Sequence, residues 1–293
     1  MGMRSLVVFL FAVMVFAVAC TTSSDERHFT MQGQIVSLAS DHHEATIKHE
    51  EINGLMPAMT MPYKVRDPKL LDGLTAGDLI VAKLVIIPND AYLTEVTKVG
   101  RAPLEKPAED APAASSGFEQ LTAGERVPNA AFVDQDGKKR DFASFKGQTI
   151  VLTFIYTNCP MPTFCPLMDR HFASIQKKLK DDPALAAVSR VHLVSVSFDP
   201  ATDTPPVLKN HAKRLEADPK TWTFLTGDRD EVDKFAARFG VSVGRSLTDD
   251  RNITHNLRTA IIDRDGKVLK VYTGNEWTPD QIVADLKAVG PVD

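Results

Sequence analysis

Two cysteines in the second half of the chain have the chemistry to bind a soft metal ion or to exchange disulfides. Cys159 and Cys165 lie in the stretch Phe154-Ile-Tyr-Thr-Asn-Cys-Pro-Met-Pro-Thr-Phe-Cys-Pro166, with five residues between them. Pro166 suits the first position of a helix. We therefore expect Cys165 at a helix start, where the positive end of the helix dipole favours a thiolate. Both kinds of chemistry remain open for such a loop.

A histidine further along the chain is the candidate third ligand. His255 lies in Asn252-Ile-Thr-His-Asn-Leu257, just before a predicted strand at 258–263. A lone histidine is more often structural or solvated than a ligand. In a sheet built from alternating strands and helices, however, a loop that enters this strand faces the turn that carries the cysteines. Met161, inside the cysteine loop, is a further soft donor.

A second group of soft ligands lies in the first half, in the stretch His49-Glu-Glu-Ile-Asn-Gly-Leu-Met56-Pro-Ala-Met59-Thr-Met61-Pro62. Residues two apart in a strand point to the same face, so Met59 and Met61 project side by side. Thioether sulfur suits Cu(I) or Ag(I) and binds Zn(II) and Mg(II) poorly. His49, from a neighbouring strand, adds an imidazole, and Met56 adds a third sulfur. An arbitrary pair of methionines would be core packing, but three so close together, flanked by prolines, indicate a metal site.

The amino terminus has the features of a bacterial lipoprotein leader. Arg4 is followed by an unbroken apolar run over 6–19 and then by Cys20. That run is too short to span a membrane and fits a secretory signal peptide. The sequence Ala17-Val18-Ala19-Cys20 resembles a lipobox, in which the cysteine becomes the lipidated first residue. We expect lipidation at Cys20, with free secretion or an uncleaved anchor as the alternatives.

The overall composition sets the class of protein and of partner. The chain has 293 residues, three cysteines and a formal net charge of -4, without a run of Lys or Arg. Nucleic acid is therefore not an expected partner. With Cys20 lipidated, the remaining pair is Cys159 and Cys165, which outside the cytoplasm forms a disulfide unless a metal ion or a reductant keeps it reduced.

The patterning along the chain predicts two domains that would position these residues. Short strand-like segments over 29–100 predict a small all-β, OB-like barrel. A Pro- and Ala-rich linker at 101–117 follows and allows the two domains to move relative to each other. Strands then alternate with helices over 118–293, which predicts an α/β sheet with helices on both faces. Before the barrel we expect a signal peptide at 1–19 and a tether at 20–28.

The first of these domains resembles the CusF family of periplasmic Cu(I)- and Ag(I)-binding proteins. The resemblance rests on the methionine segment and on Gly73-Leu-Thr-Ala-Gly-Asp78 before a strand. It implies a five-stranded barrel with one histidine and two methionine ligands, here His49, Met59 and Met61. The family places a tryptophan over the metal, and Met56 stands at that spacing in this chain.

The second domain resembles the SCO/SenC family of thioredoxin-fold copper chaperones. The resemblance rests on Val127-Pro-Asn129, Phe145-Lys-Gly147, the cysteine segment, Ser197-Phe-Asp-Pro200 and the His255 segment. It implies Cys159, Cys165 and His255 as copper ligands, and a role in assembly of the copper A centre of cytochrome c oxidase. The family usually has three residues between the cysteines, and the five here alter the geometry and redox potential of the pair.

Together these features predict a Cu(I) metallochaperone, lipid-anchored on the extracytoplasmic side of a bacterial envelope. Its expected partner is the copper-bearing subunit of cytochrome c oxidase or another periplasmic copper protein. Two alternatives stay open. One is a thiol-disulfide oxidoreductase in which Cys159 and Cys165 are the catalytic redox pair and reduce a copper-site client. The other is copper sequestration for resistance, in which the barrel does the binding.

Overall fold

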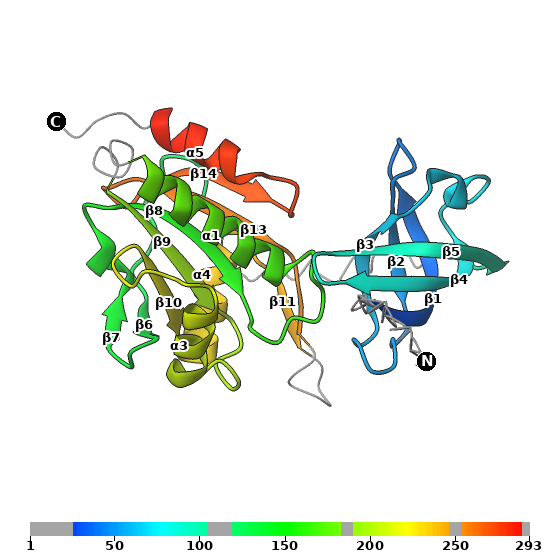
Figure 1. Ribbon diagram of the computed structural model, residues 1–293, viewed down its shortest axis with the longest axis horizontal. Coiled ribbons are helices and arrows are strands. Elements are labelled where there is room, and N and C mark those ends of the chain that lie inside the picture. Colours follow the sequence, from blue (N-terminus) through cyan, green and yellow to red (C-terminus); the bar gives the residue numbers. More distant parts are fainter. Residues whose placement is uncertain (1–25, 105–118, 183–189, 246–252, 289–293) are drawn as a thin grey trace, which may run out of the picture.

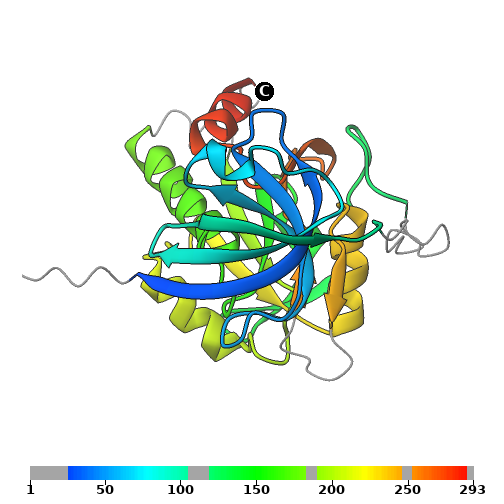
Figure 2. The same cartoon turned by 90° about the vertical axis from the view of Figure 1, so that its right-hand side faces the viewer.

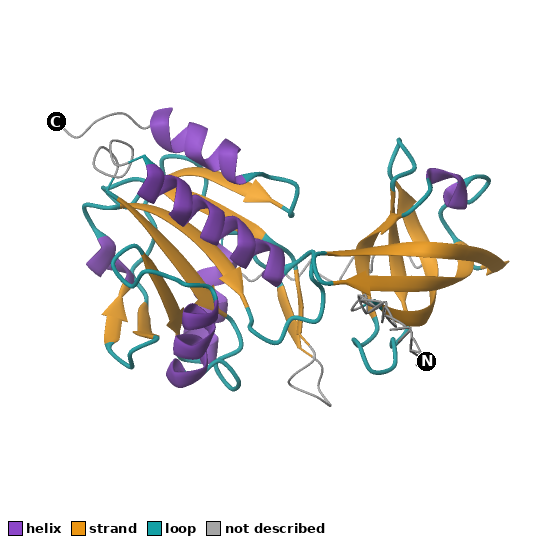
Figure 3. Cartoon of the chain, in the orientation of Figure 1, coloured by secondary structure: helices purple, strands orange, loops and turns teal. Residues whose placement is uncertain are grey.

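The computed structural model describes residues 26–104, 119–182, 190–245 and 253–288. It forms two domains that lie against each other (Figure 1). The first consists almost entirely of strands, and the second combines strands with helices (Figure 3). The predicted signal peptide, Cys20 and most of the predicted linker lie outside the described residues.

The first domain is a closed five-stranded barrel with the strand order β1-β2-β3-β5-β4. Strand β1 is long and bent, and it closes the barrel by pairing with β2 on one side and β4 on the other. The predicted all-β barrel is therefore confirmed. Its elements are β1 (Arg27–Leu38), β2 (Glu44–His49), β3 (Met59–Val65), the 3-10 helix η1 (Pro68–Leu71), β4 (Asp78–Ile87) and β5 (Asp90–Arg101).

Alternation along β2 and β3 decides which side chains enter the barrel. In β2 the buried positions are Ala45, Ile47 and His49. In β3 the face that carries Met59 continues through buried Met61 and Tyr63. Successive side chains of a strand point to opposite faces, so a histidine and two methionines share the barrel interior with its apolar core.

The second domain is built on a seven-stranded sheet with the order β14-β13-β8-β9-β10-β6-β7. Its centre, β8-β9-β10, is parallel, and each of these strands is buried along its whole length, as expected for a sheet covered on both faces. The strands are β6 (Ala131–Asp134), β7 (Lys139–Asp141), β8 (Thr149–Ile155), β9 (Val191–Ser197), β10 (Trp222–Thr226), β13 (Arg258–Ile262) and β14 (Val268–Thr273); a separate two-stranded sheet joins β11 (Val243–Arg245) and β12 (Ile253–His255).

Helices cover both faces of this sheet. The chain moves from β8 to β9 to β10 in one direction, so right-handed crossovers place α1 and α3 on the same face. Helix α5 packs beside α1, and α4 covers the opposite face (Figure 2). This arrangement confirms the predicted thioredoxin-like fold. The helical elements are η2 (Phe142–Phe145), α1 (Cys165–Asp181), α3 (Pro205–Arg214), α4 (Arg229–Arg238) and α5 (Pro279–Ala288).

Helix α1 shows how local sequence positions the cysteine loop. Proline follows Cys165 at the helix start, and the face formed by Met168, Phe172, Ile175 and Leu179 is buried against the sheet. Apolar residues at this spacing form one stripe of a helix. The stripe fixes the helix start, and with it Cys165, at the carboxyl end of β8.

Among the described residues, no helix has the length and apolar character needed to cross a membrane.

Candidate metal centres

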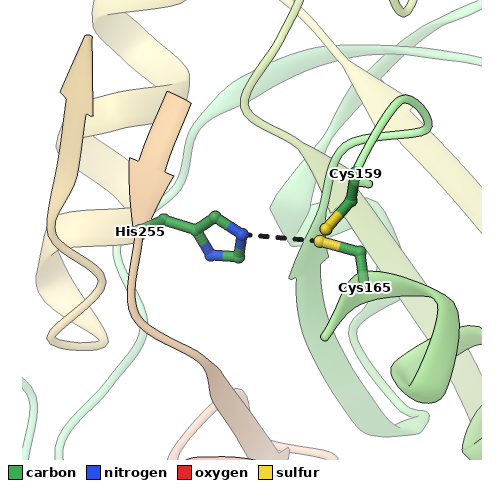
Figure 4. Close-up of side chains that lie close together, drawn as sticks. All are labelled: Cys159, Cys165 and His255. Atoms are coloured by element: carbon green, nitrogen blue, oxygen red, sulfur yellow. Dashed lines mark hydrogen bonds between the residues drawn. The ribbon is translucent and has the colours of Figure 1, made fainter. Parts of the chain in front are cut away.

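The structure brings Cys159, Cys165 and His255 together at one end of the thioredoxin-like domain. Cys159 lies in the turn after β8, Cys165 begins α1, and His255 ends β12. Their candidate ligand atoms all lie within 4.8 Å of one another. Both sulfurs and the imidazole point toward a common centre (Figure 4). Two cysteine sulfurs and one imidazole nitrogen form a donor set that suits a soft ion such as Cu(I).

The hydrogen bonds of His255 place a lone pair toward the sulfurs. Its Nδ1 atom lies 2.9 Å from the Asn256 carbonyl oxygen, and its Nε2 atom lies 3.5 Å from Cys165 Sγ. A carbonyl oxygen only accepts, so Nδ1 carries the proton in the neutral ring. Nε2 is then free to bind a metal ion. The rings of Tyr156 and Phe198 pack against the imidazole and hold its orientation.

The two thiols differ in burial and in pKa. Cys159 is partly exposed, whereas Cys165 is buried. A hydrogen bond with the Cys165 thiol, helped by the His255 ring, holds the pKa of Cys159 well below its usual value. Burial, together with the adjacent Cys159, raises the pKa of Cys165 well above its usual value. The expectation that Cys165 forms a thiolate more readily than a free cysteine is therefore wrong, because desolvation outweighs the helix dipole there.

A buried aspartate, Asp203, is hydrogen-bonded to the loop that carries Cys159. Asp203 is fully buried, and its carboxylate accepts hydrogen bonds from the Thr157 backbone N–H at 3.0 Å and from the Ser197 hydroxyl at 2.5 Å. The Thr157 hydroxyl also donates to it. These charge-assisted bonds join the end of β8 to the end of β9. The turn that leads to Cys159 is thereby held at a fixed position.

The second group of soft ligands lies at the end of the barrel. His49 and Met59 face each other directly across the β2-β3 pair, and Met61 lies two residues further along the same face of β3. Directly paired side chains in antiparallel strands lie close enough to bind one ion. The structure therefore places His49, Met59 and Met61, three of the four residues that the sequence assigned to this site, on one face of the β2-β3 pair.

His49 has the same free nitrogen as His255. Its Nδ1 atom lies 2.6 Å from the Glu50 carbonyl oxygen, so Nδ1 carries the proton. Its Nε2 atom is buried and has no hydrogen-bond partner. Burial lowers the pKa of His49, which keeps the ring neutral. A buried imidazole nitrogen without a hydrogen-bond partner, on the same face as Met59 and Met61, is the arrangement expected of a metal ligand.

Met56 lies in the loop between β2 and β3, the two strands that carry His49, Met59 and Met61. It is buried, and its sulfur accepts a hydrogen bond from the Tyr63 hydroxyl at 3.8 Å. Tyr63 also packs edge-on against His49. Tyr63 thus links the predicted third sulfur to the predicted imidazole ligand. Sequence reasoning missed Tyr63, although its place two residues after Met61 on the same face was available as a signal.

The two groups of ligands face a single pocket between the domains. From the barrel it is lined by Met56, Met59 and Met61, and from the other domain by Cys159 and His255. Tyr156 also lines it, and burial near the thiols raises the pKa of its phenol. His49 does not line this pocket and lies deeper in the barrel.

Two protein families match separate parts of the chain. The sequence model of the SCO1/SenC family matches residues 122–290. The model described as copper binding periplasmic protein CusF matches residues 28–98. The first match contains Cys159, Cys165 and His255, and the second contains His49, Met56, Met59 and Met61.

Named relatives match about half of the chain. The SCO1 protein homolog of Bacillus subtilis is 36% identical over 159 residues, which is 54% of this chain and 79% of that protein. An SCO2-like protein of Rickettsia typhi is 27% identical, over 48% of this chain and 66% of that protein. The mouse mitochondrial SCO2 homolog is 26% identical, over 54% of this chain and 59% of that protein.

Two solved structures are each similar to just over half of this chain. A SCO1/SenC family lipoprotein from Bacillus anthracis is 31% identical, with a TM-score of 0.49 over 56% of this chain and 94% of that chain. Copper-bound ScoI from Bradyrhizobium japonicum is 27% identical, with a TM-score of 0.47 over 56% of this chain and 99% of that chain.

Proposed function

Because the chain belongs to the SCO1/SenC family, we propose that it is a copper metallochaperone of the bacterial cell envelope. In this proposal the Cys159, Cys165 and His255 centre binds Cu(I) as cargo and delivers it to another protein. The leading acceptor is the copper A site in the copper-bearing subunit of cytochrome c oxidase, and other periplasmic copper proteins are the alternative. The barrel provides a second Cu(I) site.

The observation that carries the proposal is the convergence of Cys159, Cys165 and His255 within 4.8 Å. These residues come from three elements far apart in the sequence, and general core packing does not require two thiols and an imidazole to meet. The free Nε2 atom of His255 completes the donor set. Cu(I) binding to the pair displaces any thiol proton into solvent, since the ligand is the thiolate.

The barrel supports the same choice of metal. Thioethers are soft and neutral, so Met59 and Met61 with the Nε2 atom of His49 favour Cu(I) and also accommodate Ag(I). Met56 adds a further sulfur near the opening. Two sites built from different donors that favour one ion are expected in a protein that receives copper at one site and passes it on from the other.

The proposal places the protein on the extracytoplasmic side, anchored by a lipid on Cys20. A lipid-anchored chaperone would meet the copper-bearing domain of a membrane-bound oxidase at the membrane surface. Mass spectrometry of the membrane fraction tests this part: wild type carries an acylated amino-terminal peptide, and Cys20→Ala does not. An unmodified, soluble wild-type protein contradicts the anchor without affecting the copper sites.

The copper sites are tested by anaerobic Cu(I) titration of the reduced protein against a calibrated chelator. We expect two tight sites. Cys159→Ser/Cys165→Ser should remove one, Met59→Leu/Met61→Leu should remove the other, and Met31→Leu, in the barrel core away from the pocket, should keep both. Copper binding that survives loss of both cysteines and is lost with the methionines refutes the role assigned to the thioredoxin-like domain.

One observation favours a second function, thiol-disulfide exchange. The low-pKa Cys159 is partly exposed, and the buried Cys165 lies next to it. The Cys159 thiolate would attack a client disulfide and form a mixed disulfide. Cys165 would then lose its proton and attack Cys159, releasing the client dithiol and leaving this chain oxidised, to be reduced by an external thiol.

Exchange and copper binding differ in their need for His255. A His255→Ala variant that reduces a disulfide-bonded peptide at the wild-type rate but no longer binds Cu(I) shows that the cysteines have an independent redox activity. A variant that loses both activities shows that disulfide reduction and Cu(I) binding both require His255.

A further inference from the structure

Met161 occupies an unusual position between the two copper sites. It belongs to the cysteine loop of the thioredoxin-like domain, yet its buried side chain packs into the hydrophobic core of the barrel. It also lines the pocket between the domains, together with Met56, Met61 and Cys159. Its thioether is thus placed among the soft donors of both sites.

The longer cysteine loop is what allows this placement. Five residues separate the two cysteines, and Met161 is the second of them, between two prolines. The Arg170 guanidinium holds the loop against the barrel, since it donates to the Pro162 carbonyl at 2.9 Å and to the Asn89 carbonyl at 3.4 Å. Cys159 and Phe164, at the two ends of the segment, contact the cores of both domains.

The pocket has room for an ion. Its volume is about 130 Å³, and a polar cavity needs only about 10–15 Å³ of such space to hold one water. An ion with a few waters therefore fits inside. Within this arrangement of the domains, soft donors of both domains border the same space.

We propose that Met161 is the transfer ligand that passes Cu(I) between the methionine site and the Cys/Cys/His site of one molecule. This inference rests on the proposed function. Cu(I) exchanges one thioether of Met59 or Met61 for the Met161 thioether, and then exchanges thioethers for the thiolates of Cys159 and Cys165. Copper stays Cu(I) throughout, each thiol that is still protonated releases one proton to solvent on binding, and the reverse transfer takes these protons up.

Methionine-methyl NMR tests whether Met161 binds the ion. In the Cys159→Ser/Cys165→Ser variant, thiolates cannot compete, and Ag(I) serves as a diamagnetic probe for Cu(I). The Met161 methyl signal is assigned by its loss in Met161→Leu. On addition of Ag(I) we expect it to shift together with those of Met59 and Met61, while the buried methyl groups of Met31 and Met168 stay unchanged. A static Met161 signal when Met59 and Met61 shift overturns the proposal.

Rapid mixing tests the transfer itself. Chelator-bound Cu(I) is mixed anaerobically with excess reduced full-length protein, and the ultraviolet absorbance of Cu(I)-thiolate bonds is followed. We expect a phase whose rate does not depend on protein concentration. Met161→Leu, which keeps the apolar packing but removes the sulfur, should slow that phase by about tenfold, equivalent to about 1.4 kcal/mol of activation free energy. Met31→Leu should leave it unchanged.

The outcomes separate the two proposals. If wild type binds no Cu(I) through its cysteines or methionines, the proposed function fails and the transfer role falls with it. If both sites bind Cu(I) with wild-type affinity in Met161→Leu and the concentration-independent phase keeps its rate, the proposed function stands and only the transfer role is refuted.

Discussion

At the scale of single residues, the two histidines of the candidate copper sites are oriented by the same kind of hydrogen bond. Each directs Nδ1 to the backbone carbonyl of the residue that follows it, Glu50 for His49 and Asn256 for His255. That bond fixes the tautomer and leaves Nε2 as a lone pair for a metal ion. This bond is local, since neighbouring backbone supplies the partner.

We predict that His255→Ala weakens Cu(I) binding at the cysteine centre by about tenfold or more, equivalent to about 1.4 kcal/mol, because one of three donors is lost. Chelator competition measures this loss. Cu(I) binding at the methionine site should not change. His171→Ala is the matched control, since His171 is a half-buried histidine on α1 that packs against Trp277. Equal losses of Cu(I) affinity in both variants would mean that the His255 substitution weakens binding only by destabilising the folded domain.

At the scale of elements, the spacing of β1 and β2 sets the position of His49. Gly33 in β1 pairs with His49, and a Cβ atom on Gly33 would lie 2.7 Å from the Lys48 carbonyl oxygen and 2.9 Å from His49 Cα. Backbone atoms cannot move away as a flexible side chain can. The absence of a side chain at position 33 is therefore required for the close approach of the two strands.

We predict that Gly33→Ala destabilises the barrel by about 1–3 kcal/mol and reduces Cu(I) affinity at the methionine site, because β2 must shift. Amide exchange of β2 and chelator competition measure the two effects, and binding at the cysteine centre should persist. Gly100→Ala is the control: there the nearest atom to an added Cβ is Leu79 Cδ1 at 3.5 Å, an ordinary contact. Similar effects of both substitutions would contradict the steric argument.

Strand β9 carries the buried histidine His192, which belongs to neither group of candidate copper ligands. His192 bonds to the Thr223 hydroxyl at 2.8 Å, and burial lowers its pKa from 6.5 to about 4. Between these two values the unfolded chain takes up a proton that the folded chain does not. Its contribution to stability is therefore complete above about pH 6.5 and is lost as the pH falls toward about 4.

We predict that replacing His192 with glutamine flattens the decline in unfolding free energy over this pH range by about 1–3 kcal/mol. Denaturant unfolding followed by tryptophan fluorescence isolates the relevant domain, since the chain's two tryptophans, Trp222 and Trp277, both lie in the thioredoxin-like domain. His28→Gln, on the exposed face of β1, should keep the wild-type decline. An unchanged decline in the His192 variant would assign the pH effect to other groups.

At the scale of the whole molecule, the two domains meet where several of the candidate copper ligands lie. Arg170 bridges the cysteine loop and the β4-β5 hairpin, and the pocket between the domains contains ligands from both. In the proposed function, delivery to another protein requires this face to open, because the ligands that line the pocket lie between the two domains. The strength of the interface therefore controls how often these candidate ligands are exposed.

We predict that Arg170→Gln weakens the closed arrangement by about 1 kcal/mol for each hydrogen bond lost. Small-angle scattering should show a larger radius of gyration, and amide exchange should rise around Met59 and Met61. Lys177→Gln, on the exposed side of the same helix, should change neither. If the Arg170 variant keeps the wild-type dimensions and exchange, other contacts hold the domains together.

The sequence by itself determined the two folds and the donors available in each. Alternation over β2 and β3 placed His49, Met59 and Met61 on one face, and the apolar stripe of α1 placed Cys165 at a helix start, because both patterns depend on local geometry. The family resemblance then linked His255 to the cysteines, whereas periodicity carries no information about residues so far apart in the chain.

Only the tertiary structure decided which thiol is the stronger acid and how the two sites face each other. The helix dipole, inferred from local sequence, favoured a thiolate at Cys165, but the burial of that thiol is set by packing between β8, α1 and β12 and raises its pKa instead. The shared pocket depends on contacts between Met161 and a barrel core about a hundred residues away. Desolvation and contact between domains arise from the packed surface as a whole, and no local pattern in the sequence encodes them.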